Sequence, residues 1–414
     1  MMRHLKMIAI SLFCFYTSTA AQPADSAISA IAPKIFIDCR WCDIDYIRDE
    51  INFINYVYDR KNADIHLLIT TRSTGSGGSE YSLTFIGQNA FKAHSDTLIF
   101  TTLHDDTEDL LRQKLVKHIK IGLIPYLSNT PIMEDISIQY TKKTSTIIKE
   151  DHWNNWVIRM SMNGWFNGEK NSRNSNIYAR VSADRITDDW KIRLSIFASY
   201  QENKYRWDEQ WFSSTQKSNS FSGSFVRSLS NHWSLGGFLN ANSSSYMNIR
   251  SGFNVSPAIE YNIFPYSEST RREIRVMYRI GSEYVFYDSE TIYFKTKEQL
   301  FGQSLKISLK FKQPWGTAYT DIIGSHYFHD LAKNHLTIFS DLSIRLFKGF
   351  SINLYGGFSR IHDQLHLRRT GMSKEDVLLR RYSLETSYNY WGSLGFQYAF
   401  GSIYNNIVNP RFGN

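Results

Sequence analysis

Residues 387–400, SYNYWGSLGFQYAF, carry the pattern that decides the fold. Large apolar side chains fall on one parity of this stretch and small or polar ones on the other, and only Trp391 departs from the pattern. Strict alternation over this length predicts a β-strand with one apolar and one polar face. Roughly ten residues, tilted by about 45°, are what a strand needs to cross a bilayer. The apolar parity comprises Tyr388, Tyr390, Leu394, Phe396, Tyr398 and Phe400.

Similar alternation recurs from about residue 153 onwards, in twelve segments altogether. They are residues 156–166, 177–186, 190–200, 221–229, 233–241, 255–264, 274–284, 305–311, 318–328, 336–346, 350–358 and 388–400. Connections after the even-numbered segments are mostly short, whereas several of the others are long, such as 201–219 and 287–303. Short turns on one side and long loops on the other are typical of outer-membrane barrels, with the short side periplasmic. We therefore expect an all-β antiparallel transmembrane barrel of about 12 strands over residues 153–401.

The end of the last segment resembles the C-terminal signal by which Gram-negative outer-membrane β-barrel proteins are recognised for insertion. Its residues are a polar Ser393, then Gly395, then aromatics at Tyr398 and Phe400. The resemblance implies insertion into outer-membrane lipid, with the barrel-insertion machinery as a partner. One departure is the tail at 402–414, because many such barrels end at the terminal aromatic residue.

Composition excludes a helical membrane protein and agrees with a barrel. Aromatic residues make up 15% of the 414 residues, yet the mean hydropathy is negative and no internal run of 18 apolar residues occurs. A barrel shows its apolar face only at every second residue and stays polar on average. The net charge of +8 does not indicate nucleic-acid binding, because the basic residues are spread over predicted lumen and loops outside the cytoplasm.

The N-terminus has the organisation of an export signal. Arg3 and Lys6 precede an apolar core at 7–16, and small residues at 18–21 provide a cleavage region. We expect a signal peptide at 1–21 and a polar tether at 22–33. Cys14 does not indicate a lipoprotein, since Phe13 stands before it where a small residue is needed. The expected location is the outer membrane, with the N-terminal domain in the periplasm.

Residues 34–128 predict a compact α+β domain, followed by a linker at 129–152. The expected elements are strands at 34–38, 63–71, 81–87 and 97–102 and helices at 43–59 and 107–127. This order resembles small periplasmic domains appended to outer-membrane proteins. The glycine-serine stretch at 73–79 is interpreted as a mobile hairpin loop rather than a phosphate-binding loop, because no Lys-Ser/Thr and no helix follow it.

Cys39 and Cys42 are the two cysteines of the predicted mature chain. In an exported protein a local disulfide is the favoured interpretation. A metal site would need two further ligands, and a thioredoxin-like redox role is supported only by the spacing and by the position at a strand end.

Basic residues occupy the parity of the strands that we assign to the lumen. They are Arg159, Arg180, Lys191, Arg193, Arg275, Arg279, Lys306, Lys310 and Arg345. Strand direction places most of them in the periplasmic half, where lumenal acids such as Asp184, Glu260 and Glu273 are available as partners. These residues are either polar filler of a narrow barrel, or a ring that attracts an anionic solute or docks the N-terminal domain.

Histidines cluster near the predicted external mouth. His326, His329, His362 and His366 lie there with His335, Asp330 and Asp363. They are candidate metal ligands, but histidine is also common in interfacial loops. We therefore assign no metal and expect no cofactor. Ser325 and His326 are adjacent, and neighbouring strand residues point to opposite faces, so they cannot act as nucleophile and base. No catalytic residue is assigned.

These patterns predict a non-enzymatic outer-membrane β-barrel component. It would act as a membrane anchor or narrow channel, with a periplasmic domain that binds a protein partner. One alternative is a selective channel for small anionic solutes that is gated by the N-terminal domain. Another is a lipid-modifying hydrolase embedded in the barrel. A barrel of about twelve strands leaves little open lumen once side chains fill it.

Overall fold

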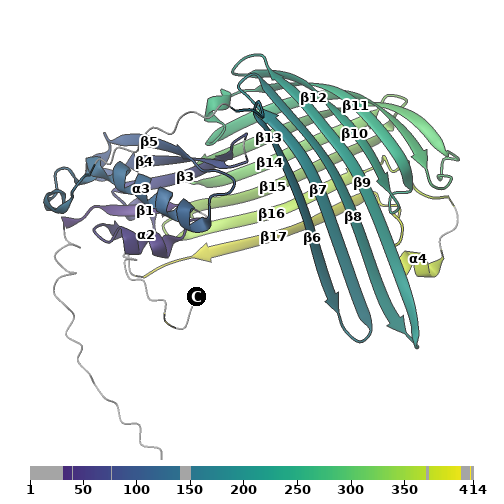
Figure 1. Ribbon diagram of the computed structural model, residues 1–414, viewed down its shortest axis with the longest axis horizontal. Coiled ribbons are helices and arrows are strands. Elements are labelled where there is room, and N and C mark those ends of the chain that lie inside the picture. Colours follow the sequence, from purple (N-terminus) through teal and green to yellow (C-terminus); the bar gives the residue numbers. More distant parts are fainter. Residues whose placement is uncertain are drawn as a thin grey trace, which may run out of the picture.

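The computed structural model describes residues 31–39, 41–75, 77–139, 151–369, 373–401 and 411. The predicted signal peptide (1–21), most of the predicted tether (22–33) and nearly all of the predicted tail (402–414) lie outside these residues. Two β-sheets make up the described chain: a small N-terminal sheet with helices on it, and a large sheet that forms most of the molecule (Figure 1).

The small sheet has five strands in the order β2-β1-β3-β4-β5. Its strands are β1 (Lys34–Asp38), β2 (Asn55–Tyr56), β3 (Ile65–Ser73), β4 (Ser79–Gly87) and β5 (Ser95–Thr101). The helices of this region are α2 (Ile44–Glu50), α3 (Glu108–Leu127) and the short 3-10 helices η1 (Arg60–Asn62), η2 (Asn89–Phe91) and η3 (Pro131–Asp135). Strand β1 runs parallel to β2 and β3, and the other neighbours are antiparallel. The predicted α+β class of this region is therefore confirmed.

The predicted helix at 43–59 is only partly correct. Asp43 caps α2 by accepting a hydrogen bond from the Tyr46 N–H, but the helix ends at Glu50. Five residues after this helix ends, Asn55 and Tyr56 form β2 beside β1. The helical spacing found the correct core residues but not the correct element, because pairing with a neighbouring strand overrides local periodicity.

Alternation along β3 gives the small sheet two different faces. Ile65, Leu67 and Ile69 point into the core, where they pack with Phe85 and with the buried face of α3. Burying a side chain of this size stabilises a fold by about 1.5–3 kcal/mol. The opposite face carries His66, which is also buried. That opposite face is the one that meets the large sheet.

The large sheet contains twelve strands, each antiparallel to its neighbours and arranged in chain order. They are β6 (Trp156–Gly168), β7 (Ser172–Ile186), β8 (Trp190–Trp207), β9 (Gln210–Ser228), β10 (Trp233–Ser244), β11 (Ile249–Asn262), β12 (Arg272–Tyr287), β13 (Lys297–Gln313), β14 (Gly316–Tyr327), β15 (Asp330–Phe347), β16 (Phe350–Ile361) and β17 (Tyr388–Tyr398). Short helices η4 (Tyr266–Glu268) and α4 (Lys374–Leu378) interrupt the connections. The predicted twelve antiparallel strands are confirmed. The sheet is not closed: no pairing within the described residues joins β6 to β17, and the two strands diverge in Figure 1.

Several strands are longer than the sequence pattern predicted. The expected long loop at 201–219 is mostly strand, because β8 and β9 continue to a tight turn at Asp208 and Glu209, both with positive φ. The expected loop at 287–303 likewise shortens to the residues between Tyr287 and Lys297. Polar residues continue the backbone ladder as well as apolar ones do, so a search for apolar alternation ends before the strand does.

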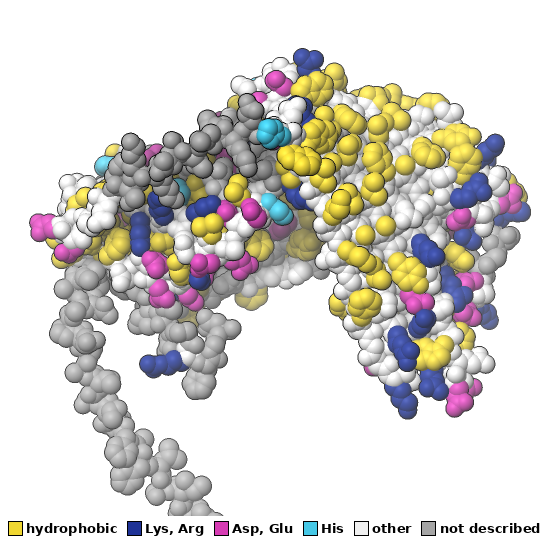
Figure 2. Space-filling view, in the orientation of Figure 1, with side chains coloured by type: hydrophobic (Ala, Val, Ile, Leu, Met, Phe, Trp, Pro, Cys, Tyr) yellow, Lys and Arg dark blue, Asp and Glu magenta, His cyan; other side chains and the backbone are white. Residues whose placement is uncertain are grey.

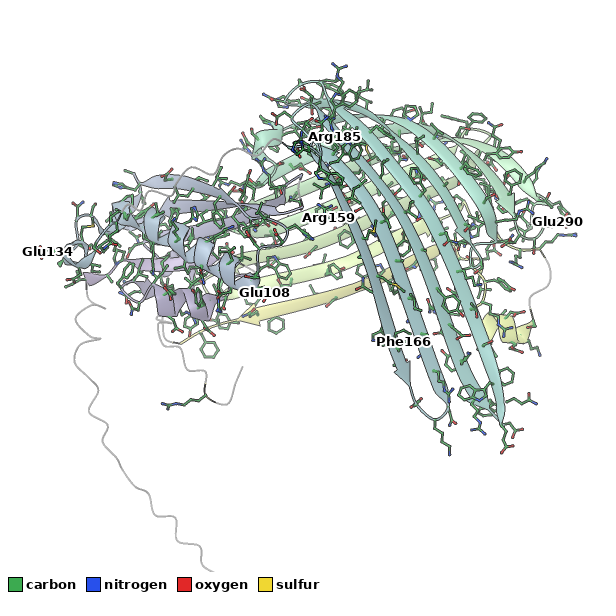
Figure 3. All side chains as sticks on the ribbon, viewed as in Figure 1. Glu108, Glu134, Arg159, Phe166, Arg185 and Glu290 are labelled. Atoms are coloured by element: carbon green, nitrogen blue, oxygen red, sulfur yellow. A yellow bond between two sulfur atoms is a disulfide. The ribbon has the colours of Figure 1, made fainter. Side chains whose placement is uncertain are left out.

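The connection after β16 folds back over the large sheet at the end opposite to the small sheet. Leu365 is buried in a cluster with Val285, Tyr287 and Leu300. The Arg369 N–H donates to the carbonyl of Glu290, which Figure 3 labels at this end. The connection between β16 and β17 therefore partly covers this end of the large sheet.

One face of the large sheet leaves many apolar side chains uncovered. Figure 2 shows them distributed over the strands, with charged residues concentrated toward the ends. Leu394 and Phe396 on β17 are 74% and 77% exposed. Exposed apolar side chains gathered on one face in this way mark a site of interaction with a protein, a ligand or a membrane. No helix in the described part of the chain is long and apolar enough to cross a membrane.

Candidate functional site at the junction of the two sheets

An ion pair between Asp38 and Arg345 lies at the centre of the junction between the two sheets. Asp38 ends β1, and Arg345 lies on β15, 307 residues further along the chain. The guanidinium donates two hydrogen bonds to the carboxylate, at 2.6 and 2.9 Å. It also lies over the ring of Phe36, 5.2 Å from the ring centre. A bidentate pair of this kind fixes orientation as well as contributing energy.

His66 provides a second partner for the Asp38 carboxylate. Its Nε2 atom lies 3.2 Å from Asp38 Oδ2 on the neighbouring strand β3. Burial by itself would raise the pKa of Asp38, but the hydrogen bonds and charges of Arg345 and His66 outweigh burial and hold that pKa well below its usual range. Asp38 therefore stays ionised at ordinary pH and remains a strong acceptor for Arg345.

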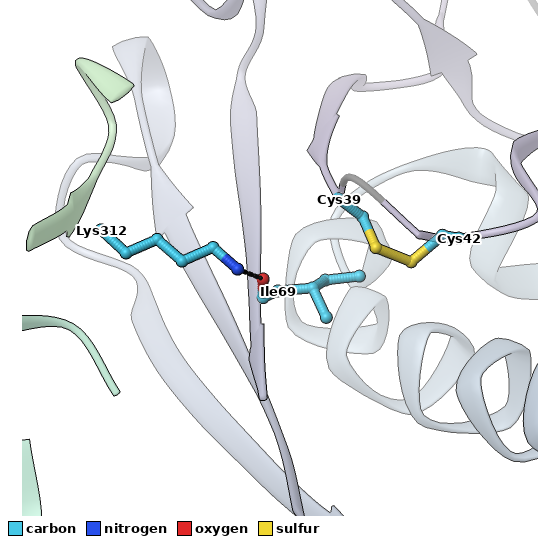
Figure 4. The surroundings of a disulfide bond; sticks show 4 residues. All are labelled: Cys39, Cys42, Ile69 and Lys312. Carbon is cyan, nitrogen blue, oxygen red and sulfur yellow. Dashed lines mark hydrogen bonds between the residues drawn. A yellow bond between two sulfur atoms is a disulfide. The ribbon is translucent and has the colours of Figure 1, made fainter. Parts of the chain in front are cut away.

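A lysine near the end of β13 makes the next contact. Lys312 Nζ donates a hydrogen bond of 2.8 Å to the backbone carbonyl of Ile69 on β3, close to the Cys39–Cys42 disulfide (Figure 4). Apolar alternation ended the expected strand at residue 311, so Lys312 fell in an expected short connection without a role. Nothing in the local pattern identifies its partner, because the acceptor is a backbone atom of a distant strand.

A glycine in the turn between β15 and β16 makes a further contact. The Gly349 N–H donates to Asp59 Oδ2 at 2.5 Å. Gly349 has a φ of +72°, and a Cβ there would lie 2.0 Å from the carbonyl oxygen of Ala399. Only glycine fits this turn without strain. The position of the Gly349 N–H, which donates to Asp59, therefore depends on the residue being glycine.

The loop between β3 and β4 reaches the other side of the large sheet. A Cβ on Gly77 would lie 1.9 Å from the guanidinium of Arg159 on β6, and one on Gly75 would lie 3.0 Å from Ile186 at the end of β7. Arg159 lies at the end of the sheet that faces the small domain (Figure 3). The N-terminal domain therefore touches the first strands and the last strands of the large sheet at the same end.

The nine basic residues of the predicted lumen divide into two groups. Five make an ion pair with a carboxylate: Arg159 and Arg193 with Asp184, Arg275 with Glu260 and Glu273, Lys306 with Asp321, and Arg345 with Asp38. The other four, Arg180, Lys191, Arg279 and Lys310, make no ion pair with the described residues. Two of these four lie over aromatic rings, Arg180 over Phe197 and Arg279 over Phe238. One of the nine, Arg345, is thus anchored to the N-terminal domain.

The disulfide Cys39–Cys42 follows β1 directly, and Cys42 is adjacent to the residue that caps α2. A cavity of about 570 Å³ lies beside it, with Trp41 on its edge at 84% exposure. Both cysteines pack against the domain core. The disulfide therefore links the strand that carries Asp38 to the following helix.

The histidines of the far end are not brought together. The Nε2 atom of His326 lies 2.7 Å from Nε2 of Gln303, and that of His366 lies 3.4 Å from Oγ of Ser383. The ring of His329 packs on Tyr327. His335 Nδ1 lies 3.1 Å from Asp363 Oδ1. The described ranges contain no group of three or more His, Cys, Asp or Glu side chains that could hold a metal ion. His362 and the other candidates thus have no common centre.

The strand register brings together one arrangement that the sequence analysis missed. Ser325 on β14 is directly opposite His335 on β15, and His335 is paired with Asp363. Reading neighbours along one strand could not find it, because the register between strands decides which residues meet. The described contacts include no hydrogen bond between Ser325 and His335. The backbone N–H groups beside Ser325 belong to the pairings with β13 and β15, so the part of the chain that the structure describes offers no oxyanion site there.

The residues of the predicted insertion signal lie at the edge of the large sheet. Ser393, Gly395 and Tyr398 are on β17, and Phe400 follows it at 85% exposure. No family model matches the chain, and no curated protein matches it either. The fold and the junction between the two sheets therefore carry the functional argument.

Proposed function

We propose that this chain is a non-enzymatic outer-membrane β-barrel protein whose periplasmic domain closes the mouth of a narrow barrel. The twelve antiparallel strands and the exposed apolar face support the membrane placement. Strands β6 and β17 are the two free edges and run in opposite directions, so pairing between them would complete a barrel and remove both edges.

The single observation that carries the proposal is the bidentate contact between Asp38 and Arg345. Arg345 is on the parity that we assign to the lumen, and it reaches the domain rather than an acid of the barrel wall. Contacts at Lys312, Gly349 and Gly77 place the domain across the same end of the sheet. This arrangement favours a domain that occludes the barrel over one that hangs free on a linker.

The proposal includes outer-membrane lipid and the barrel-insertion machinery as partners. The domain's own surface remains available to a periplasmic protein, and this would make the barrel an anchor for an assembly. Gated passage of small anionic solutes is the second candidate, and the lumenal basic residues without an ion pair, such as Lys191 and Lys310, favour it. The long connection between β16 and β17, which partly covers the far end, argues against a wide diffusion pore.

Charge exchange at the central ion pair tests the occlusion. The experiment compares the full-length chain with Asp38→Arg, Arg345→Asp and the double exchange in planar lipid bilayers. Each single reversal places like charges in contact and should release the domain, so conductance should rise in both. The double exchange restores opposite charges and should return conductance to that of the unmodified chain.

Equal conductance in all four proteins would contradict occlusion by the domain. Lys92→Glu is a suitable control, because Lys92 is exposed on the same domain and makes no ion pair with the described residues. It should leave conductance unchanged. If it raised conductance as much as Asp38→Arg does, the effect would come from general charge rather than from the junction.

A further inference from the structure

A polar cavity lies within the junction, between the N-terminal domain and the ends of β15, β16 and β17. Its volume is about 430 Å³. The sheet contributes residues from three successive strands, Arg345 among them, and the domain contributes Phe36, Tyr58, Asp59, Arg60 and Lys61. Neither part forms the cavity by itself.

Three cations line the cavity: Arg345, which is paired with Asp38, and Arg60 and Lys61, which make no ion pair with any described residue. The carboxylate of Asp59 also lines the cavity, and each of its oxygens already accepts a backbone hydrogen bond. Oδ1 accepts a hydrogen bond from the Lys61 backbone N–H at 2.8 Å, and Oδ2 accepts from the Gly349 N–H at 2.5 Å.

The wall of the cavity that the sheet provides is lined by neutral hydrogen-bonding groups. They are the side chains of Ser343, Ser351, Asn353 and Gln397. None of the four makes a side-chain hydrogen bond with the described residues. Hydroxyl and amide groups aimed at a space with these cations are the lining that an oxyanion with several acceptor oxygens requires.

From this lining we propose that the cavity is a binding site for a phosphate-bearing anion, shared between the domain and the barrel wall. Arg60 and Lys61 supply the positive charge, and the amides of Asn353 and Gln397 donate to the remaining oxygens. The inference rests on the proposed docking of the domain and adds a ligand to it. Because only the docked arrangement completes the site, the bound anion also stabilises docking.

The surroundings of the cavity suggest the source of the phosphate. Gln397 and Ala399 line it from the edge of the sheet, and the alternate residues Phe396, Tyr398 and Phe400 leave their rings exposed on the other face. A phospholipid at the rim would place its headgroup in the cavity and its acyl chains against those rings. A free phosphorylated solute offers the same headgroup chemistry without the chains.

Calorimetric titration of the full-length chain in neutral detergent tests the proposal. The probes are dihexanoylphosphatidylglycerol, inorganic phosphate and the zwitterionic dihexanoylphosphatidylcholine. The double variant Arg60→Gln, Lys61→Gln should weaken binding of the phosphatidylglycerol by roughly tenfold or more, because two of the three cations of the cavity are removed. The matched control is Lys92→Gln, Lys117→Gln, which removes two exposed lysines elsewhere on the domain and should leave affinity unchanged.

A second variant tests whether the wall takes part. Asn353→Ala, Gln397→Ala should also weaken binding, and an unchanged affinity would overturn a site shared by both parts. Equal weakening by the control, equal binding of the phosphatidylcholine, or no binding of any probe would overturn the anion site. Inorganic phosphate binding as tightly as the phosphatidylglycerol would support the site and identify a free anion as its ligand. None of these variants touches Asp38 or Arg345, so a failure here is separate from a failure of the conductance experiment.

Discussion

Strands β3 and β17 both carry large apolar residues, but in opposite surroundings. Six successive residues of β3, from Ile65 to Thr70, are buried, whereas all eleven residues of β17 are exposed. β3 has the core and α3 on one face and the large sheet toward the other. The outward face of β17 has no protein against it. An apolar surface exposed to water is unfavourable, so the contrast supports the proposed membrane placement of the large sheet.

The largest expected effect is the difference in stability between a substitution in the domain core and one on the exposed face of the large sheet. Phe85 is fully buried on β4 against α3, and Leu394 is 74% exposed on β17. Phe85→Ala should lower the free energy of unfolding of the domain by about 3–5 kcal/mol, because a cavity replaces the ring. Leu394→Ala should change the free energy of unfolding by no more than about 0.5 kcal/mol in detergent, because the micelle covers the site. Denaturant unfolding followed by hydrogen exchange measures each region separately.

Equal destabilisation by Leu394→Ala and Phe85→Ala would contradict the contrast between a buried domain core and an exposed face of β17. Such a result would mean that β17 is covered by protein in solution. The apolar face of the large sheet would then be an interface, and the membrane placement would lose its main support. Ile121→Ala on the exposed side of α3 is a control with a comparable loss of apolar surface and a small expected effect.

A substitution in the ion pair at the junction should have a smaller effect on stability than Phe85→Ala. The side chains of Asp38 and Arg345 are 17% and 33% exposed. Losing one partner of such a pair costs about 2–5 kcal/mol, and partial exposure places the expected effect of Asp38→Asn near the lower limit. Hydrogen exchange of the β1 peptide reports the docking.

The same pair gives a pH dependence with a defined sign. The folded-state pKa of Asp38 is lowered, so its carboxylate stabilises docking above the unfolded pKa of about 3.9. That contribution is lost as the pH falls below about 4 toward the lower folded pKa. Exchange protection of β1 in the unmodified chain should hold from pH 7 to 4 and then fall, whereas Asp38→Asn should show a flat profile. A fall beginning near pH 6 in the unmodified chain would assign the dependence to another group.

The sequence predicted what repeats locally and missed what depends on distant partners. Apolar alternation located all twelve strands of the large sheet, and helical periodicity located α3. Both are properties of consecutive residues. The strand β2 was missed because its pairing with β1, rather than its own two residues, makes it a strand. The ends of β8 and β9 were missed because their polar residues lack the apolar signal.

The candidate site shows the same division. Parity alone assigned Arg345 to the lumen, and docking of the domain was one of the alternatives considered for it. Its partner could not be chosen from sequence, because Asp38 is 307 residues away and several acids were available. Lys312 was missed for a similar reason, since its partner is a backbone carbonyl that any residue could supply. Long-range packing decides such contacts.

The smallest expected effect concerns Ser325, at the end of the large sheet away from the junction. Its register opposite His335, with Asp363 beyond, has the residue types of a hydrolase in the order serine, histidine, carboxylate. Two physical requirements are missing within the described residues. The serine hydroxyl makes no hydrogen bond to the imidazole, and backbone donors next to it serve strand pairing rather than a developing oxyanion. We therefore expect no labelling of the full-length chain by a fluorophosphonate, and no change in conductance on Ser325→Ala.

The labelling experiment is informative in both directions because the two ends of the large sheet are proposed to differ. Charge exchange at Asp38 acts at the domain end and should change conductance, whereas Ser325→Ala acts at the far end and should not. Fluorophosphonate labelling that disappears in both Ser325→Ala and His335→Ala would show an activated serine, and the non-enzymatic proposal would have to be abandoned. Labelling that persists in both variants would place the reactive group elsewhere and leave the assignment of the far end as polar lining intact.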